Sequence, residues 1–473
     1  MTAFPKWIQR LFCLCFVLCF LAIAVMNSAG LGVLLIAAAV LIPKKISIPH
    51  FLPLLLVVSA IVHVAAVFLV NPEPIQDFAT MYHAAQQAAE GDFSFQHTQY
   101  FFIWAYQTGF VLWEALLLKV FGHMTAIKLV HALMLSGING LIYLWARRFT
   151  DERAAQTAAL LYLVTLFPTV LNCLLTNQVA SAFFLLLGMY ILTDGNNAFS
   201  VPRAIGAGIL LSIGNILRPE AIVILAGLAG TAIFILIMKR SVRQHKRMLS
   251  GIVLAVIVYA VCNAGASWAV SAGGINQYGL SNNWTSWKFI VGLNHETGGM
   301  YSADDRALFD DAHQIDTTEQ QAKATAAAEN QLIRSRILVS PGKLLSLMKE
   351  KVYHLWVQSG LSFPMGYFNN PEVSVHGIPG PRFYQNCVTL DRTVFGLAGL
   401  FALLGMLSLL RRKPETLTFS AVLAPMTVMA CFAVFLLIEV QPRYVFLPQI
   451  FLYITAAMGI TPLFSLMRET EGT

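Results

Sequence analysis

Residues 417–466 decide the fold class. They read LTFSAVLAPMTVMACFAVFLLI (417–438), EVQPRY (439–444) and VFLPQIFLYITAAMGITPLFSL (445–466). The only charged residues in this stretch are Glu439 and Arg443, and both lie in the short turn between the two apolar runs. Each run is long enough to cross the ~30 Å hydrocarbon core of a bilayer as a helix. Because lipid offers the backbone no hydrogen-bond partner, each run is predicted to be helical.

The same pattern recurs along the whole chain of 473 residues. Only 12% of the residues are charged, 57% are hydrophobic and the mean hydropathy is +0.67, whereas soluble proteins carry about 25% charged residues. This composition excludes a soluble enzyme, a disordered chain and an ordinary nucleic-acid binder. We expect an all-α polytopic membrane protein with about 12 transmembrane helices, the other ten lying near 11–27, 29–43, 51–70, 124–146, 154–171, 177–193, 204–217, 220–238, 249–270 and 387–410.

Clusters of Lys and Arg indicate how these helices are oriented, because short cytoplasmic loops are enriched in basic residues. The clusters lie at 44–45, 147–148, 239–247 and 411–413. With the N-terminus inside, twelve spans place every cluster on the cytoplasmic side. The first apolar run resembles a signal peptide, but a second run follows it without a clear cleavage site, which favours an uncleaved anchor. We therefore predict a multi-pass protein of the cell membrane with both termini cytoplasmic.

The first long segment predicted on the extracytoplasmic side is the loop 71–123. Its residues 101–121 are apolar enough to span the bilayer, but they include Glu114 and other polar residues. Counting them as a span would also invert every basic cluster downstream. We therefore predict an interfacial or re-entrant helix, with Trp104 and Trp113 among its interface anchors.

The second long segment, about 271–386, is predicted to be a small extracytoplasmic domain. A helical pattern covers 303–337 and an amphipathic one covers 343–356, while in the first loop a short helix over 78–89 is expected to end at Gly91. The chain then divides into four predicted parts: an N-terminal transmembrane hairpin (1–50), a transmembrane core that carries the first loop (51–270), the loop domain (271–386) and C-terminal transmembrane helices (387–473).

A few ionisable residues lie at the predicted outer mouths of the spans. Such groups are costly near a membrane and are therefore candidates for function. They occur in three places: Glu73 and Asp77 follow the third span, Arg218 and Glu220 flank a proline between the seventh and eighth spans, and Glu439 and Arg443 lie in the last turn. Arg can hold a phosphate through two parallel hydrogen bonds, and a carboxylate can act as a base. Each group could also be a solvated loop charge or a simple ion pair, and spacing alone leaves this open.

Several motifs with a known mechanism are absent from the sequence. It contains no phosphate-binding loop with its lysine, no dinucleotide-binding glycine pattern, no nucleophile elbow and no HExxH. His83 lies near Asp77 in the sequence, but a lone histidine is more often a structural residue. If the protein is an enzyme, its substrate is already activated.

The order of these features resembles the GT-C-fold glycosyltransferases, polytopic enzymes that use polyprenyl-phosphate-linked sugars. The resemblance rests on motifs spread over about residues 50–460. They are Pro74-Ile75-Gln76-Asp77 with Tyr82-His83-Ala84-Ala85, Tyr100-Phe101-Phe102 to Gly122, Leu144-Trp145-Ala146-Arg147-Arg148, Leu217-Arg218-Pro219-Glu220, Gly292-Leu293-Asn294 to Asp305, and Glu439-Val440-Gln441-Pro442-Arg443-Tyr444. In two respects the sequence departs from the family pattern: two spans precede the Asp77 hairpin, and 104–106 lacks the usual proline.

The resemblance implies transfer of a hexosyl or pentosyl group from a polyprenyl-phosphate donor to a glycan, lipid or protein acceptor on the outer face of the membrane. Asp77 would be the catalytic carboxylate, and Arg218 and Arg443 would hold the leaving phosphate beside Tyr444. The residues expected to bind substrate are Glu73, Gln76, Tyr82, His83, Arg218, Glu220, Glu439, Arg443 and Tyr444. No cofactor is expected, although a divalent metal is not excluded, and no metal ligand is assigned.

Two other functions suit the same sequence features. One is a transporter or flippase of lipid-linked saccharides, which twelve spans would also fit. The other is a glycan polymerase or ligase, whose outer loops also carry arginines. Transporters usually carry inverted repeats with interrupted helices near the midplane. No matched pair of interruptions is visible in the sequence, which favours the transferase.

Overall fold

The computed structural model describes residues 3–27, 48–193, 200–239, 242–368, 381–411 and 417–469. Every regular element in these ranges is a helix, which confirms the predicted all-α class. The apolar helices of the bundle are α1 (Ala3–Asn27), α3 (Phe51–Leu69), α7 (Met124–Ala146), α8 (Glu152–Val164), α9 (Leu166–Asn172), α10 (Gln178–Leu192), α11 (Val201–Leu217), α12 (Ala221–Lys239), α13 (Val242–Ala272), α19 (Pro381–Arg411), α20 (Phe419–Leu437) and α21 (Phe446–Glu469).

Seven helices in the described part of the chain are long and apolar enough to cross a membrane, or eight if α8 and α9 form one bent span. These two helices meet at an angle of 51° at Thr165. The helices α10 and α11 are apolar but shorter. The predicted run 29–43 lies outside the described residues, as do the basic residues 44–45 and 412–413. The multi-pass membrane class is thus confirmed, and the total of twelve spans stays a prediction.

The centre of the bundle is formed by α19 and α21, and lipid-facing helices surround it. Of the apolar stretch of α21, 94% is buried, compared with 22% in α3 and 11% in α13. Gly405 and Gly459 allow α19 and α21 to approach closely, because a Cβ at Gly459 would overlap the carbonyl oxygen of Phe401. Residues of these two helices, including Phe401 and Tyr453, are almost inaccessible to solvent.

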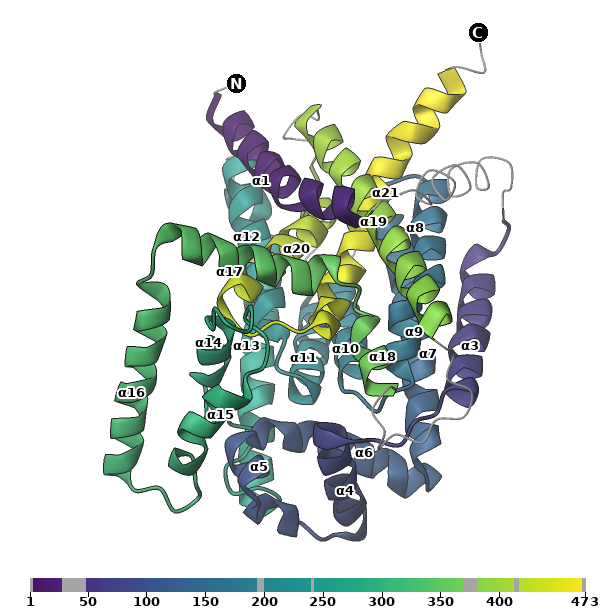
Figure 1. Cartoon of the computed structure of the whole chain (residues 1–473). Helices are drawn as coiled ribbons and strands as arrows, with labels where there is room; N and C mark the ends of the chain where they lie inside the picture. The colour runs from purple at the N-terminus through teal and green to yellow at the C-terminus, as the bar shows by residue number, and fades with distance from the viewer. Residues whose placement is uncertain are drawn as a thin grey trace.

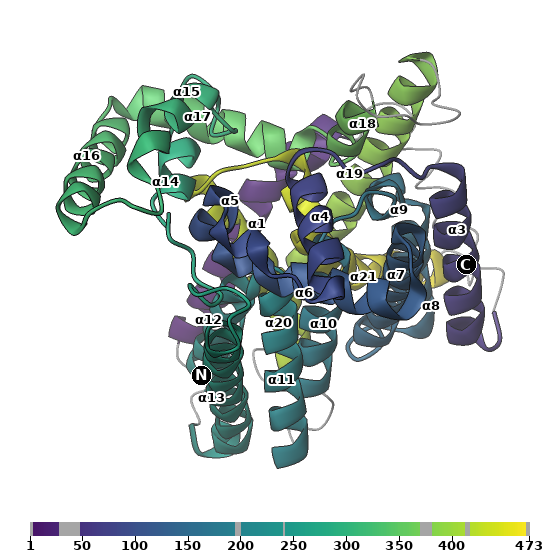
Figure 2. The ribbon, with the colours of Figure 1, turned by 90° about the horizontal axis from the view of Figure 1, so that it is seen from below.

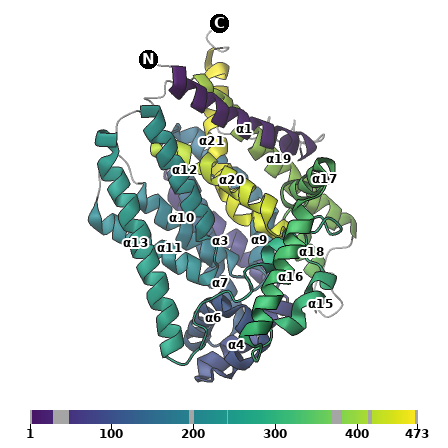
Figure 3. The ribbon, with the colours of Figure 1, turned by 90° about the vertical axis from the view of Figure 1, so that its left-hand side faces the viewer.

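Shorter helices cover one end of this bundle. They are α4 (Gln76–Glu90), η1 (Ser94–His97), α5 (Gln99–Ile103), η2 (Ala105–Gln107), α6 (Thr108–Phe121), α14 (Trp287–Gly292), α15 (Ala303–Phe309), η3 (Asp310–Ala312), α16 (Glu319–Ile337), α17 (Pro341–Val352), η4 (Tyr353–Val357), α18 (Ser362–Phe368) and η6 (Pro442–Val445). Figures 1 and 3 show α4 and α6 at the end of the molecule opposite to both termini. Viewed from that end, α14–α17 form a group to one side of α4–α6 (Figure 2).

The first loop follows its predicted pattern in part. The helix predicted over 78–89 is α4, which ends at Gly91 with a φ of 88°, a backbone conformation that favours glycine. Residues 101–121 are broken into three short helices, of which the longest, α6, has 14 residues. That is about 21 Å, too short for the ~30 Å core. The break agrees with the prediction that this segment does not span.

Two further expectations can be compared with the structure, and the second needs correction. Trp104 stacks on Trp284, and the Trp113 indole donates to Nε2 of His131 at 3.0 Å. Both side chains are partly exposed, and their role as interface anchors stays a prediction. The pattern over 303–337 is not one helix. It breaks between α15 and α16, where Thr318 begins α16 with a capping box to Gln321. Local side-chain hydrogen bonds there outweigh the helical periodicity.

Candidate active site

A cavity of about 490 Å³ opens at the end of the bundle covered by the short helices. We call it the charged cavity. Two tight turns line it, one between α11 and α12 and the other between α20 and α21. Its polar lining residues are Asp77, Tyr100, Tyr106, Gln107, Asn177, Arg218, Glu220, Asn282, Lys288, Tyr301, Arg306, Glu439, Gln441, Arg443 and Tyr444. The structure thus brings together residues that lie more than 360 positions apart in the sequence.

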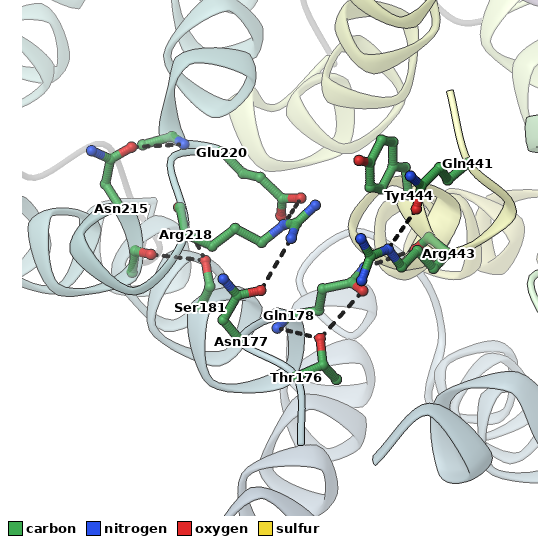
Figure 4. A network of polar contacts seen from close by, with 12 residues as sticks. Thr176, Asn177, Gln178, Ser181, Asn215, Arg218, Glu220, Gln441, Arg443 and Tyr444 are labelled. Carbon is green, nitrogen blue, oxygen red and sulfur yellow. Dashed lines mark hydrogen bonds and ion pairs between the residues drawn. The ribbon is translucent and has the colours of Figure 1, made fainter. Parts of the chain in front are cut away.

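The first turn carries Arg218 at the end of α11. Its Nε atom is ion-paired with Glu220, and its Nη1 atom donates to Oδ1 of Asn177 at 3.0 Å (Figure 4). The hydroxyl of Ser181 donates to the Gly214 carbonyl at 2.8 Å, which ties the end of α11 to α10. Arg218 is therefore held firmly, and its charge is largely balanced inside its own turn.

The second turn carries Arg443, whose surroundings differ. Its Nε atom donates to the neutral amide oxygen of Gln441 at 2.8 Å (Figure 4). The guanidinium carbon lies 4.4 Å from the ring centroid of Phe363 and 5.3 Å from that of Phe78. In the part of the chain that the structure describes, no carboxylate forms an ion pair with Arg443. Its two Nη groups are thus placed to donate to an anionic ligand.

Glu439 begins the same turn and pairs with a residue from the loop domain. Its carboxylate forms an ion pair with Lys288 and accepts hydrogen bonds from Gln441 at 3.0 Å and from the Tyr444 hydroxyl at 3.2 Å. The Glu439 side chain is only 3% exposed. Burial alone would raise the pKa of Glu439, but the Lys288 ammonium and the hydrogen bonds from Lys288 and Gln441 outweigh it. The pKa is held below its usual value, so the carboxylate stays ionised.

Backbone contacts fix this second turn against the predicted loop domain. The Glu439 amide donates to the Lys288 carbonyl at 2.8 Å, and the Val440 amide donates to the Gly299 carbonyl at 2.9 Å. The buried Lys351 ammonium donates to the carbonyls of Gly292 at 2.7 Å and Ile438 at 2.8 Å. Burial lowers the pKa of Lys351 to about 7, although Glu439 acts in the opposite direction. The turn between α20 and α21 is therefore held in place by residues of the predicted loop domain as well as by its own two helices.

Asp77 enters the cavity from the first turn of α4, where a carboxylate is favoured by the helix dipole. It is exposed, and the next residue, Phe78, lies under Arg443. The preceding residue, Gln76, has a φ of 53°, a left-handed conformation that is costly for a residue with a side chain. The residue that follows, Asp77, lines the charged cavity from the first turn of α4.

The loop before α4 is anchored by a buried lysine. The Lys128 ammonium of α7 donates to Oδ1 of Asn71 at 2.8 Å and to the Pro72 carbonyl at 2.7 Å. Asn71 also donates to the Thr125 hydroxyl at 3.1 Å. These bonds fix the chain a few residues before Asp77.

Two partly buried tyrosines complete the lining of the charged cavity. Burial, reinforced by the Asp77 carboxylate, raises the pKa of Tyr100 well above its usual value. Burial also raises the pKa of Tyr106, against the opposing effect of Lys288. Both phenols therefore remain protonated and able to donate hydrogen bonds to a ligand.

Six of the ten predicted site residues line the charged cavity: Asp77, Arg218, Glu220, Glu439, Arg443 and Tyr444. The other four, Glu73, Gln76, Tyr82 and His83, do not line it. His83 is exposed and bonds Gln86 through Nδ1 at 3.1 Å, because its position on α4 turns it away from Asp77.

Sequence reasoning missed other polar residues of the lining, chiefly Lys288, Arg306 and Asn177. Lys288 and Arg306 lie in a predicted loop domain of mixed polarity, where no pattern distinguishes a site residue from a solvated one. Asn177 begins the apolar run of α10, and its polar character was the one available signal. Among the described residues, no group of three or more His, Cys, Asp or Glu side chains could hold a metal ion.

Comparisons with known proteins show what the chain is similar to. Residues 109–263 match the family described as dolichyl-phosphate-mannose-protein mannosyltransferase. This match confirms the resemblance to the GT-C-fold glycosyltransferases on a third of the chain. It includes Asn177, Arg218 and Glu220 of the charged cavity. Among curated proteins, no sequence matches the chain significantly.

Two solved structures are also similar to the chain. One is the archaeal oligosaccharyltransferase AglB from Archaeoglobus fulgidus, in complex with an inhibitory peptide and a dolichol-phosphate (15% identity, TM-score 0.48). The match covers 89% of this chain but 52% of AglB, so the chain spans about half the length of that protein. The other is ArnT from Cupriavidus metallidurans bound to undecaprenyl phosphate (15% identity, TM-score 0.39), with 90% and 79% covered.

Proposed function

We propose that the protein is a glycosyltransferase that moves a hexosyl or pentosyl group from a polyprenyl-phosphate donor to a glycan, lipid or protein acceptor. The observation that carries this proposal is Arg443, a guanidinium that lies in a cavity with Asp77 and forms no ion pair within the described residues. The site lies at the end of an apolar helix bundle, and the anion that it is suited to bind there is the phosphate of a membrane lipid. The family match over 109–263 supports the same donor class.

The proposed reaction uses the cavity residues in complementary roles. An acceptor hydroxyl attacks the anomeric carbon of the donor sugar, and its proton passes to the Asp77 carboxylate. The bond between the anomeric carbon and the phosphate oxygen breaks, and polyprenyl phosphate leaves with the electron pair. Arg443, supported by Arg218 and Lys288, stabilises the charge that develops on that phosphate. Since the lipid-linked bond supplies the driving force, no nucleotide has to be hydrolysed.

The proposal also includes the sidedness of the reaction. Both termini lie at the end of the bundle opposite to α4 and α6 (Figures 1 and 3). With the termini cytoplasmic, as the basic clusters predict, the charged cavity opens to the extracytoplasmic side of the cell membrane. Reporter fusions in the 147–148 loop and at Asp316 test this, with a cytoplasmic signal expected from the first and an external one from the second.

The decisive experiment is transfer of a labelled sugar by the full chain in lipid nanodiscs, with undecaprenyl-phosphate-linked glucose, mannose and arabinose as donors. Asp77→Asn removes the base and keeps the side-chain shape, so we expect kcat to fall at least about 100-fold. The matched control is Glu90→Gln, an exposed carboxylate at the other end of α4, which should keep full activity. Undiminished transfer by Asp77→Asn would reject the catalytic assignment. Movement of lipid across the bilayer without any transfer would support a flippase instead.

A further inference from the structure

A second cavity lies next to the charged one, at the ends of α11 and α13. It measures about 320 Å³ and is lined by Tyr106, Asn215, Ile216, Pro219, Tyr259, Asn263, Ala264, Ser267 and Leu280. We call it the neutral cavity, because none of these residues is charged. Tyr106 and Pro219 line both cavities, so the two are separated by a single layer of side chains.

The two cavities lie on opposite sides of the Arg218–Glu220 turn. Figure 4 shows Asn215 on one side of that turn and Arg443 on the other. Asn215 itself caps the start of α12, since its Oδ1 atom accepts a hydrogen bond from the Ala221 amide at 3.2 Å. Pro219, which lines the neutral cavity, directly follows Arg218, which lines the charged one. A group bound in the neutral cavity would therefore lie next to the Arg218 turn.

Polar side chains in this place need an explanation, because they lie on helices that face lipid. Polar groups in a membrane helix are costly unless they are paired. Some pairing is internal: Asn215 donates to Oδ1 of Asn263 at 3.0 Å, and Asn263 donates to the Ser212 hydroxyl at 3.0 Å. Those bonds join α11 to α13 and account for the two amides in part.

The hydroxyl groups of the neutral cavity are not accounted for in this way. Within the described ranges, the phenol hydroxyl of Tyr259 makes no hydrogen bond. The ring of Tyr106 lines the neutral cavity, but its phenol interacts with Lys288 and Tyr444 of the charged cavity. Ser267 accepts one from the Leu280 amide at 3.0 Å, which leaves its own proton available. The cavity thus offers uncharged donors and acceptors beside two aromatic rings. This combination is suited to the hydroxyl groups and ring face of a sugar. A hydrocarbon chain could not form hydrogen bonds with these donors and acceptors.

We propose that the neutral cavity is a subsite for one uncharged sugar ring, which belongs either to the lipid-linked donor or to the acceptor. The inference rests on the proposed function and makes it more specific. It divides the substrate between two neighbouring cavities by charge: the phosphate goes to the arginines and the sugar goes to the neutral amides and hydroxyls. A charged sugar, such as an amino sugar or a uronic acid, would be disfavoured in this subsite.

Ala264 offers a way to fill the neutral cavity without disturbing the charged one. It is exposed, lines the neutral cavity and is absent from the lining of the charged cavity. Ala264→Phe therefore occupies the space with an apolar ring. Ala260→Phe is the matched control, because Ala260 is exposed on the same helix and lines neither cavity.

The test measures binding to the full chain in nanodiscs for three kinds of probe: undecaprenyl phosphate, the same lipid carrying glucose, mannose or arabinose, and octyl β-glucoside as a sugar without phosphate. If the subsite takes the donor sugar, Ala264→Phe weakens the best sugar-bearing lipid at least tenfold and leaves undecaprenyl phosphate within twofold. If it takes the acceptor sugar, both lipids bind as before and octyl β-glucoside loses at least tenfold. Ala260→Phe should change none of them.

Other outcomes overturn the inference. One is an Ala264→Phe variant that binds all probes like the Ala260→Phe control. Another is a loss of affinity for undecaprenyl phosphate itself, which would mean that the neutral cavity holds the lipid chain. Failure of the proposed function has a different signature: undecaprenyl phosphate would not bind even to the unmodified protein, whatever the effect of Ala264→Phe on octyl β-glucoside.

Discussion

The two tight turns that line the charged cavity have similar sequences but different electrostatics. Each places an acid and an arginine beside a proline between two apolar helices. In the first turn, Arg218 and Glu220 pair with each other. In the second, Glu439 pairs with Lys288 from a distant segment. Within the described residues, the Arg443 side chain forms no ion pair and instead contacts a neutral amide and aromatic rings. The comparison predicts that pairing, rather than the presence of an arginine, decides which turn can bind an anion.

The largest effect is expected from the two arginines. Arg443→Gln should lower kcat/KM about 10²–10³-fold, because it removes a positive charge that forms no ion pair within the described residues. Arg218→Gln should cost about tenfold, since that charge is already balanced by Glu220. Both variants are compared in the labelled-sugar assay with Arg334→Gln, an exposed arginine on α16. Equal losses at the two positions would show that pairing does not distinguish the turns.

The second prediction concerns the packing that positions the second turn. A Cβ at Gly292 would overlap the carbonyl carbon of Ile438 and the amide nitrogen of Glu439. Gly292→Ala should therefore displace Glu439 and Arg443 and lower kcat/KM about 10- to 100-fold, as small misplacements do. Gly206→Ala is the control, because its Cβ would meet nothing within 4 Å. A fully active Gly292→Ala variant would mean that the turn does not need this contact.

The third prediction is a dependence of stability on pH through Lys351. Burial lowers the pKa of Lys351 in the folded protein from 10.5 to about 7. Between these values the unfolded chain binds the proton more strongly, so this lysine contributes stability that increases as the pH rises from about 7 towards 10.5. The slope is at most about 1.4 kcal/mol per pH unit. Lys351→Met should lack this increase when thermal unfolding is followed between pH 6.5 and 9, and parallel curves would refute it.

The smallest expected effect comes from removing the partner of the paired arginine, Arg218. Glu220→Gln removes the partner of Arg218 and should make the first turn resemble the second. We expect affinity for undecaprenyl phosphate to increase about three- to fivefold in a nanodisc binding assay. Glu296→Gln, a change of carboxylate outside the lining of the charged cavity, serves as the control. Weaker binding by Glu220→Gln would show that Glu220 positions Arg218 instead of neutralising it.

The sequence predicted the two turns because a short connection between two apolar helices keeps its charged residues at the ends of those helices. Arg218, Glu220, Glu439 and Arg443 lie at the mouth of the bundle once the flanking helices form. The partner of Glu439 could not be predicted in this way. Lys288 lies 151 residues away in a polar segment, and its pairing depends on how that segment packs on α20.

The first loop shows a similar division. The end of α4 at Gly91 follows from a local preference of glycine, and the presence of Asp77 near the site follows from the family resemblance. The break inside 101–121 has no comparable local signal. It depends on tertiary contacts, such as the amide of Tyr106 donating to the Ser281 carbonyl at 2.9 Å. Such contacts cannot be predicted from the pattern of apolar residues.

The pairing of Lys288 with Glu439 has a consequence for the evolution of this protein. The segment that carries α14 supplies a wall of the charged cavity and also the counter-ion of the last turn. Exchanging that segment for one from another protein would leave Glu439 buried without its cation, beside the arginine proposed to hold the leaving group. The structure therefore predicts that an exchange of this segment has to preserve a cation at position 288.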